Sequence, residues 1–276
     1  MDFHLITQNQ REQFKKHGYL IIKNAFDEKL INSLLEVGDQ YMQTAGPIHN
    51  FYANRYINLT LDNNLIQLAT NNKIVSLVVQ LLSYDIHLMK GHIIYKYPQP
   101  TTNKPLYPDG DGRTIRNWHR DINNFDPNHP IRGTVAIRVG YCLTDFTSLN
   151  SGVTMFVPGS HKLHQPLRLK KGSLDPAEFI EPILKAGDAY LFSTSLYHTP
   201  AVNFTSNPTK VLLISYAYRW WAQQHPTPSE KVLAKMNPIT AQLFCKSYEG
   251  EDLPIRSWAA ENGLPVEDPP MRVYEN

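Results

Sequence analysis

Residues 133–145 carry the pattern that most constrains the fold of this chain. Apolar side chains recur there at every second position, with residues of another kind between them. Because successive side chains of a β-strand point to opposite faces, this alternation predicts a strand with one apolar face. The apolar positions are Val135, Ile137, Val139, Tyr141 and Leu143, and the other face carries Arg138, Gly140 and Thr144.

Other apolar segments between residues 85 and 220 are also predicted to be strands, and turns rather than regular helices separate them. A series of short strands of this kind is typical of a double-sheet barrel. The sequence therefore predicts a mainly β fold with flanking helices and a jelly-roll core, that is, a cupin-like double-stranded β-helix. The expected strands are 86–97, 133–145, 153–157, 188–198 and 210–218.

The chain of 276 residues, 42% of them hydrophobic, is long enough for one large domain with a substantial core. We expect a single domain over residues 1–276. Its parts are an N-terminal helical layer over about 1–84, a β-barrel core over 85–220 and a C-terminal cover or lid over 221–276.

Helix signals are concentrated outside the barrel core. Thr7 and Gln10 have the spacing of a capping box, and Gly18 can end the helix that they open. A strand over 19–22 should follow. Longer helices are predicted at 27–43, 65–82 and 229–244.

Charge and cysteine content exclude several classes of function. The 27 basic and 25 acidic residues give a formal net charge of +2 and are interspersed, without the basic runs of nucleic-acid binders. Two cysteines, Cys142 and Cys245, fit a reducing compartment better than a disulfide framework. We recognise no membrane span, signal sequence or peroxisomal address. We therefore expect a soluble, cytoplasmic protein that binds neither nucleic acid nor membranes, and its oligomeric state stays open.

His119, Asp121 and the distant His198 form a candidate metal site. Residues i and i+2 of an extended strand point to the same face about 6.5 Å apart, so His119 and Asp121 can both reach one ion. A second imidazole from His198 completes a set of two histidines and one carboxylate. This set is typical of non-haem ferrous oxygenases, because it leaves coordination positions open for reactants.

Several further segments share an order with a known family. Residues 13–26 precede the Trp-His-Arg-Asp block at 118–121, and Leu-Thr-Asp at 143–145 leads to Pro-Gly-Ser-His-Lys at 158–162. Ala-Gly-Asp at 186–188 opens the approach to His198. This order resembles the phytanoyl-CoA dioxygenase family of ferrous iron and 2-oxoglutarate dependent oxygenases, over most of residues 10–220.

The resemblance implies a mechanism with Fe(II), 2-oxoglutarate and dioxygen, in which 2-oxoglutarate is converted to succinate and carbon dioxide. Hydroxylation of a C–H bond in a small-molecule substrate is the expected outcome, with desaturation, ring formation or rearrangement left open. Related halogenating enzymes have a small residue in place of the carboxylate, so Asp121 disfavours halogenation. We expect a mainly apolar substrate, such as a lipid-like, terpenoid or other specialised metabolite, without excluding an amino acid.

The co-substrate contacts depart from the family pattern. The family usually anchors the distal carboxylate of 2-oxoglutarate with an arginine eleven or twelve residues beyond the distal histidine, where this chain has Thr209 and Lys210. The resemblance thus implies Lys210, on a strand face that we expect to point into the barrel, ahead of Arg219 on the opposite face. The remaining candidates for co-substrate binding are Arg55, Tyr141 and Thr199.

Two other functions are compatible with the same residues. The triad could serve a metal-dependent hydrolase or isomerase that uses no 2-oxoglutarate, or the barrel could bind a ligand without catalysis. The missing arginine keeps both alternatives open, whereas the intact triad argues against a catalytically silent barrel.

Overall fold

The computed structural model of the protein describes residues 2–44, 51–100, 117–122, 134–171, 173–248 and 253–266. The helices are α1 (Gln8–His17), α2 (Glu28–Thr44), α3 (Asn63–Ala69), α4 (Asn72–Leu81), α5 (Glu230–Leu233), α6 (Pro238–Leu243) and α7 (Pro254–Glu261), with a 3₁₀ turn η1 at Ser160–Lys162. The strands are β1 (Tyr19–Ile22), β2 (Tyr52–Tyr56), β3 (Ile86–Lys96), β4 (Ala136–Cys142), β5 (Thr154–Phe156), β6 (Ala189–Ser193), β7 (His198–Pro200) and β8 (Thr209–Tyr218).

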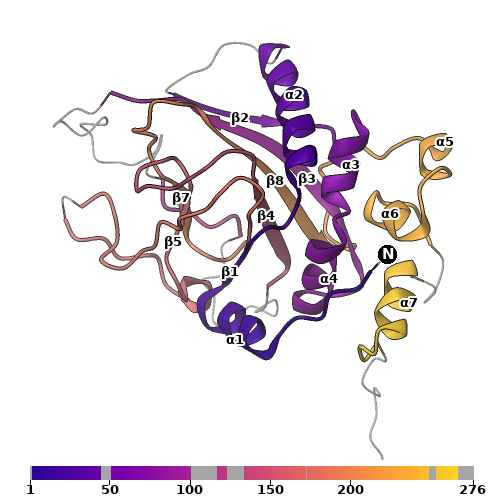
Figure 1. Cartoon of the computed structure of the whole chain (residues 1–276). Helices are drawn as coiled ribbons and strands as arrows, with labels where there is room; N and C mark the ends of the chain where they lie inside the picture. Colours follow the sequence, from indigo (N-terminus) through magenta and orange to yellow (C-terminus); the bar gives the residue numbers. More distant parts are fainter. Residues whose placement is uncertain are drawn as a thin grey trace, which may run out of the picture.

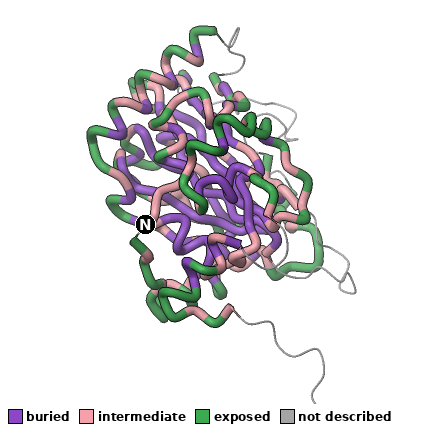
Figure 2. The backbone as a smooth tube through the Cα atoms, turned by 90° about the vertical axis from the view of Figure 1, so that its right-hand side faces the viewer, coloured by how far each residue is buried: buried purple, intermediate pink, exposed green. Residues whose placement is uncertain are grey.

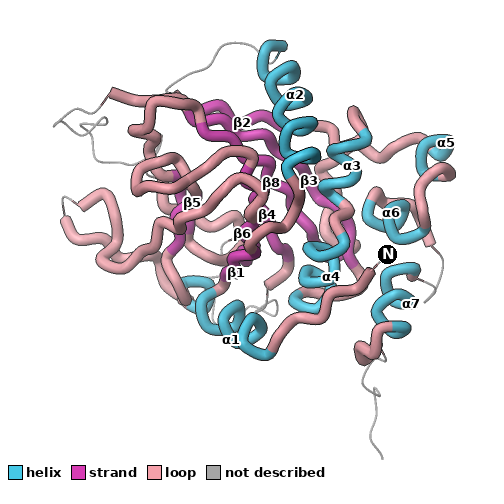
Figure 3. Tube along the Cα trace, viewed as in Figure 1, coloured by secondary structure: helices cyan, strands magenta, loops and turns pink. Residues whose placement is uncertain are grey.

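Within the described residues, two antiparallel sheets form the core of the fold. The larger sheet has six strands in the order β1-β6-β4-β8-β3-β2, and β5 pairs with β7 in the smaller one. Helices α2, α3 and α4 lie on one side of the larger sheet and β5 and β7 on the other (Figures 1 and 3). The predicted mainly β, jelly-roll architecture with flanking helices is confirmed.

Both faces of the larger sheet are buried, and they have different neighbours. Val139 of β4 and Leu212 of β8 belong to the apolar core that includes Leu34 of α2 and Ile74 of α4. The alternate residue Leu213 belongs to a second apolar cluster on the side of β5. The central strands therefore have few exposed residues, as the purple interior of Figure 2 shows. This double burial decides which side chains can reach a cavity between the sheets.

The local signals near the N-terminus produce the expected structure. The Thr7 hydroxyl accepts from the Gln10 backbone NH, and the Gln10 side chain accepts from the Thr7 NH, which together make the capping box. Gly18 ends α1 with a φ of 82°, a conformation that favours glycine. The helix expected at 27–43 is α2.

Three predicted elements are interrupted. The helix expected at 65–82 is two helices, because Asn71 begins α4 by accepting a hydrogen bond from the Ile74 NH. The helix expected at 229–244 breaks before Pro238, which stands in the first turn of α6. The strand expected at 188–198 turns after Ser193, so that β6 lies in the larger sheet and β7 in the smaller one.

Strand β2 and helix α7 were not predicted from the sequence. Helix α6 contacts β3, and Phe244 and Trp258 join the core on the side of the helices. The described C-terminal helices therefore cover the helical side of the larger sheet. Among the helices that the structure describes, none has the length and apolar character needed to span a bilayer.

Candidate metal centre

His119 and His198 are brought together by backbone pairing. The two residues form an antiparallel bridge, with N–O distances of 3.1 Å and 3.0 Å between their amides and carbonyls. Two residues further on, the Asp121 NH donates to the Thr194 carbonyl at 3.0 Å. Instead of the full strand expected from the His-x-Asp spacing, one bridge and a bend at Asp121 hold this segment against residues 194–198.

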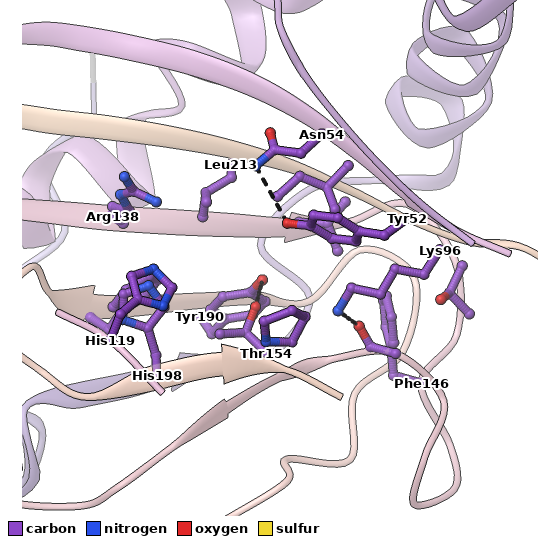
Figure 4. A pocket seen from close by; sticks show the side chains of 16 residues that line it. Tyr52, Asn54, Lys96, His119, Arg138, Phe146, Thr154, Tyr190, His198 and Leu213 are labelled. Atoms are coloured by element: carbon purple, nitrogen blue, oxygen red, sulfur yellow. Dashed lines mark hydrogen bonds between the residues drawn. The ribbon is translucent and has the colours of Figure 1, made fainter. Parts of the chain in front are cut away.

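The three predicted ligands converge. One potential ligand atom from each of His119, Asp121 and His198 lies within 4.8 Å of the other two. The Asp121 Oδ2 is 3.9 Å from the His198 Nε2, and the two imidazole centroids are 4.3 Å apart. Figure 4 shows the two rings side by side at one end of a pocket. This is the only cluster of its kind among the described residues.

Backbone carbonyls fix the orientation of both imidazoles. The Nδ1 of His119 lies 2.7 Å from the Asn117 carbonyl, and the Nδ1 of His198 lies 2.9 Å from the Leu196 carbonyl. A carbonyl oxygen can only accept, so each Nδ1 donates, and in the neutral imidazole this leaves the lone pair on Nε2. Such hydrogen bonds are the usual outer contacts of metal-binding histidines. Both residues thus present the nitrogen that a metal ion needs.

Arg138 of β4 holds the carboxylate of Asp121. Its guanidinium is 2.8 Å from the Asp121 Oδ1, and the Arg138 residue is 9% exposed. The second carboxylate oxygen, Oδ2, is buried and has no hydrogen-bond partner. A buried carboxylate oxygen without a donor is costly, and a cation at this position would satisfy it. The donor set therefore fits a divalent metal, and two imidazoles with one carboxylate suit ferrous iron.

Burial keeps His198 in the form that binds a metal. Desolvation lowers the pKa of His198 to about 3, and the neighbouring Asp121 carboxylate offsets only part of this effect. The imidazole is therefore neutral at ordinary pH. Metal ions bind the neutral form, so no proton has to be displaced from this residue.

A cavity of about 110 Å³ runs between the sheets from the two histidines. Arg138 lies at the metal end, Lys96 of β3 and Tyr52 lie at the other end, and Tyr190 lies between the two ends (Figure 4). None of these four residues was among the predicted site residues. A charged residue inside an otherwise apolar strand was a usable signal for Arg138, because a buried strand retains a charge only where it has a partner or a role. Lys96 had no such signal, since it ends a strand that also contains Lys90 and two histidines.

The structure moves Lys210 out of the site. On β8 the side chains of Thr209, Val211 and Leu213 line the cavity, so the alternate residue Lys210 points to the helical side. Its Nζ pairs with Asp39 of α2 at 2.6 Å and lies over the Tyr95 ring. The expectation that Lys210 points into the barrel is therefore wrong.

The other expected co-substrate contacts also lie away from the described cavity. Tyr141 is fully buried on the helical side, with its hydroxyl 3.1 Å from that of Tyr216. Thr199 alternates with His198 and Pro200, which do line the cavity, so its side chain faces away from it. Arg55 is adjacent to Asn54, which lines the cavity, so the Arg55 side chain also points away from it. Its guanidinium donates to the Asn54 carbonyl. Arg219 pairs with Asp85 at 3.3 Å.

Comparison with known proteins identifies the family. Residues 14–210, well over half of the chain, match the family model described as Phytanoyl-CoA dioxygenase (PhyH). The chain belongs to the phytanoyl-CoA dioxygenase family. Enzymes of this family are oxygenases that use ferrous iron, 2-oxoglutarate and dioxygen, so the predicted family and its cofactors are confirmed.

Two curated relatives of this chain are named dioxygenases. Dioxygenase hkm4 of Aspergillus hancockii is 34% identical over 105 residues, which cover 36% of this chain and 32% of that protein. Dioxygenase cnsJ of Penicillium expansum is 21% identical over 231 residues, which cover 75% of this chain and 66% of that protein. The chain thus spans less than two thirds of the length of either relative.

A solved structure shares the fold of this phytanoyl-CoA dioxygenase family member. The crystal structure of HygX from Streptomyces hygroscopicus, with nickel and 2-oxoglutarate bound, superimposes with a TM-score of 0.62 at 15% identity. The match covers 79% of this chain and 90% of that chain.

Proposed function

We propose that this protein is an Fe(II)- and 2-oxoglutarate-dependent dioxygenase that hydroxylates a C–H bond of a small organic substrate, with His119, Asp121 and His198 as the iron ligands. The observation that carries the proposal is the convergence of three ligand atoms within 4.8 Å. Family membership supports the reaction class, and the buried, unpartnered Oδ2 of Asp121 supports the position of the metal.

When bound, the iron would activate dioxygen together with 2-oxoglutarate and supply the oxidising power for attack on the substrate. The protein contributes the geometry. The Asn117 and Leu196 carbonyls hold the two imidazoles, and Arg138 holds the carboxylate. The Phe192 ring, 4.7 Å from the His198 ring, helps to keep water away from that side of the site.

The proposed substrate is a small organic molecule with a mainly apolar reacting part. Phe192, which lies beside His198, gives the metal end of the cavity an apolar surface, which favours an apolar reacting part. HygX, which shares the fold, has also been crystallised with hygromycin B bound, which supports a small-molecule substrate for this protein. The intact carboxylate of Asp121 favours hydroxylation over halogenation.

Turnover of 2-oxoglutarate tests this proposal. Purified protein with ferrous iron, 2-oxoglutarate and air should form succinate slowly even without substrate, and Asp121→Ala should form none above the iron-free control. Equal succinate formation by the two proteins would refute the ligand assignment. Tight iron binding without any succinate from the wild type would instead favour the hydrolase or isomerase alternative.

A further inference from the structure

Strand β3 places Lys96 beside the position at which the family usually has an arginine. Lys96 pairs directly with Thr209 across β3 and β8, and Thr209 is eleven residues beyond His198. Directly opposite side chains on one face of an antiparallel pair have their Cβ atoms about 5 Å apart. Lys96 and Thr209 both line the cavity, so the Lys96 ammonium can occupy the space that a long side chain at position 209 would fill.

Gly152 makes room for this lysine. A Cβ atom at Gly152 would lie 2.6 Å from the Thr209 Oγ1 and 3.0 Å from the Lys96 Cδ, and its φ of 91° also favours glycine. The Lys96 ammonium donates to the Gly152 carbonyl, and the Thr209 hydroxyl donates to the Ser151 carbonyl at 2.9 Å. Lys96 is 7% exposed. A glycine, a threonine and a turn thus hold a buried cation at the end of the cavity.

The surroundings of Lys96 suit an anion. The Tyr52 hydroxyl accepts from the Asn54 amide at 3.3 Å, so its own hydrogen can be donated to a ligand. Figure 4 shows the Lys96 ammonium and the Tyr52 ring at the end of the pocket away from His119 and His198.

We propose that Lys96 binds the distal carboxylate of 2-oxoglutarate, in place of the arginine that this chain lacks at positions 209 and 210. The inference rests on the proposed function. A dicarboxylate held by the metal at one end would meet a buried ammonium at the other, and charged hydrogen bonds of this kind are stronger than neutral ones. A lysine contributes a point charge without the two-pronged geometry of arginine. Lys96 is thus a residue that selects 2-oxoglutarate over oxo acids without a second carboxylate.

The test is an equilibrium titration without oxygen. Iron-loaded protein is titrated with 2-oxoglutarate or with 2-oxobutanoate, which has the chelating oxo acid but no distal carboxylate, and the visible charge-transfer band reports binding. Lys96→Met should weaken 2-oxoglutarate binding by about 10- to 100-fold and leave 2-oxobutanoate binding unchanged. Lys96→Arg should restore most of the preference. Lys210→Met is the matched control and should keep the wild-type preference.

The outcomes separate this inference from the proposed function. If the wild type develops no band with either acid, the proposed function fails. If the wild type develops a band but Lys96→Met binds 2-oxoglutarate as tightly as the wild type, the role of Lys96 is overturned. Equal weakening of both acids would also overturn it, because that result indicates damage to the metal site. Iron content and the thermal unfolding midpoint of each variant identify such damage.

Discussion

The Arg138 guanidinium lies 2.8 Å from the Oδ1 of Asp121 and leaves the Oδ2 buried without a hydrogen-bond partner. This relationship turns a carboxylate with two equivalent oxygens into a ligand with one oxygen available for a metal. Arg138 is therefore a positioning residue for the metal centre.

Arg138→Met should weaken ferrous iron binding by about 10- to 100-fold, because the Asp121 carboxylate would lose its fixed orientation. A metal titration followed by equilibrium dialysis measures this change. Arg55→Met removes an arginine that lies away from the cavity and should leave iron affinity unchanged. Equal iron affinities for Arg138→Met and the wild type would show that Asp121 needs no support from Arg138.

His198→Ala should lose tight iron binding while the protein stays folded. Iron affinity should fall by more than the roughly 100-fold expected when a residue that only orients a ligand is changed, since this variant removes a ligand itself. Iron content after gel filtration and the far-ultraviolet circular dichroism spectrum measure the two properties. His164→Ala removes an exposed histidine and is the control. An unchanged iron content in His198→Ala would contradict the ligand assignment.

The metal-free protein should lose stability as the pH falls from about 6.5 to about 4, in part through His92. Burial, followed by the nearby Arg138 and Lys90 cations, lowers the pKa of His92 to about 4. In this pH range the unfolded chain takes up a proton at His92 and the folded chain does not, so acid favours unfolding. His92 alone could contribute up to about 3 kcal/mol of this loss.

Urea unfolding at a series of pH values measures this dependence. His92→Gln should show a shallower loss of stability on acidification than the wild type, whereas the exposed-site variant His164→Gln should follow the wild type. Parallel pH profiles for His92→Gln and the wild type would show that His92 does not contribute to the loss of stability in acid.

Gly140→Ala should destabilise the protein by about 1–3 kcal/mol, because a Cβ at this position of β4 would overlap the ring of Tyr190. Tyr190 is fully buried and lines the cavity. Chemical denaturation measures the change. In the background Tyr190→Ala, which removes the ring, the same glycine substitution should cost much less. An equal cost in both backgrounds would place the strain elsewhere.

The three proposed metal ligands lie together in the structure, whereas the predicted co-substrate contacts lie away from the cavity, and the two lysines show why. His119, Asp121 and His198 could be proposed from their residue types, because two imidazoles and one carboxylate suit ferrous iron. The spacing of β8 shows that Lys210 shares a face with Leu212, but both faces of β8 are buried. When both faces are apolar, alternation indicates which residues share a face without indicating which face lines the cavity.

Whether Lys96 and Arg138 face the cavity likewise depends on how distant strands pair. The pairing of Lys96 with Thr209 joins strands that are more than a hundred residues apart, and no local pattern specifies it. The turn after Ser193 is similar, since it moves His198 from the larger sheet to the smaller one. The strands themselves have local signals, so four of the five expected between residues 85 and 220 have close counterparts.

The visible spectrum of the anaerobic protein tests the central claim most directly. Ferrous iron and 2-oxoglutarate are added together without oxygen, and the charge-transfer band of an iron-chelated oxo acid is recorded. The proposed ligand set predicts a band that saturates at one iron per chain in the wild type and is absent in His198→Ala. Absence of the band in iron-loaded wild-type protein would contradict the proposal that His119, Asp121 and His198 form a 2-oxoglutarate-dependent iron site.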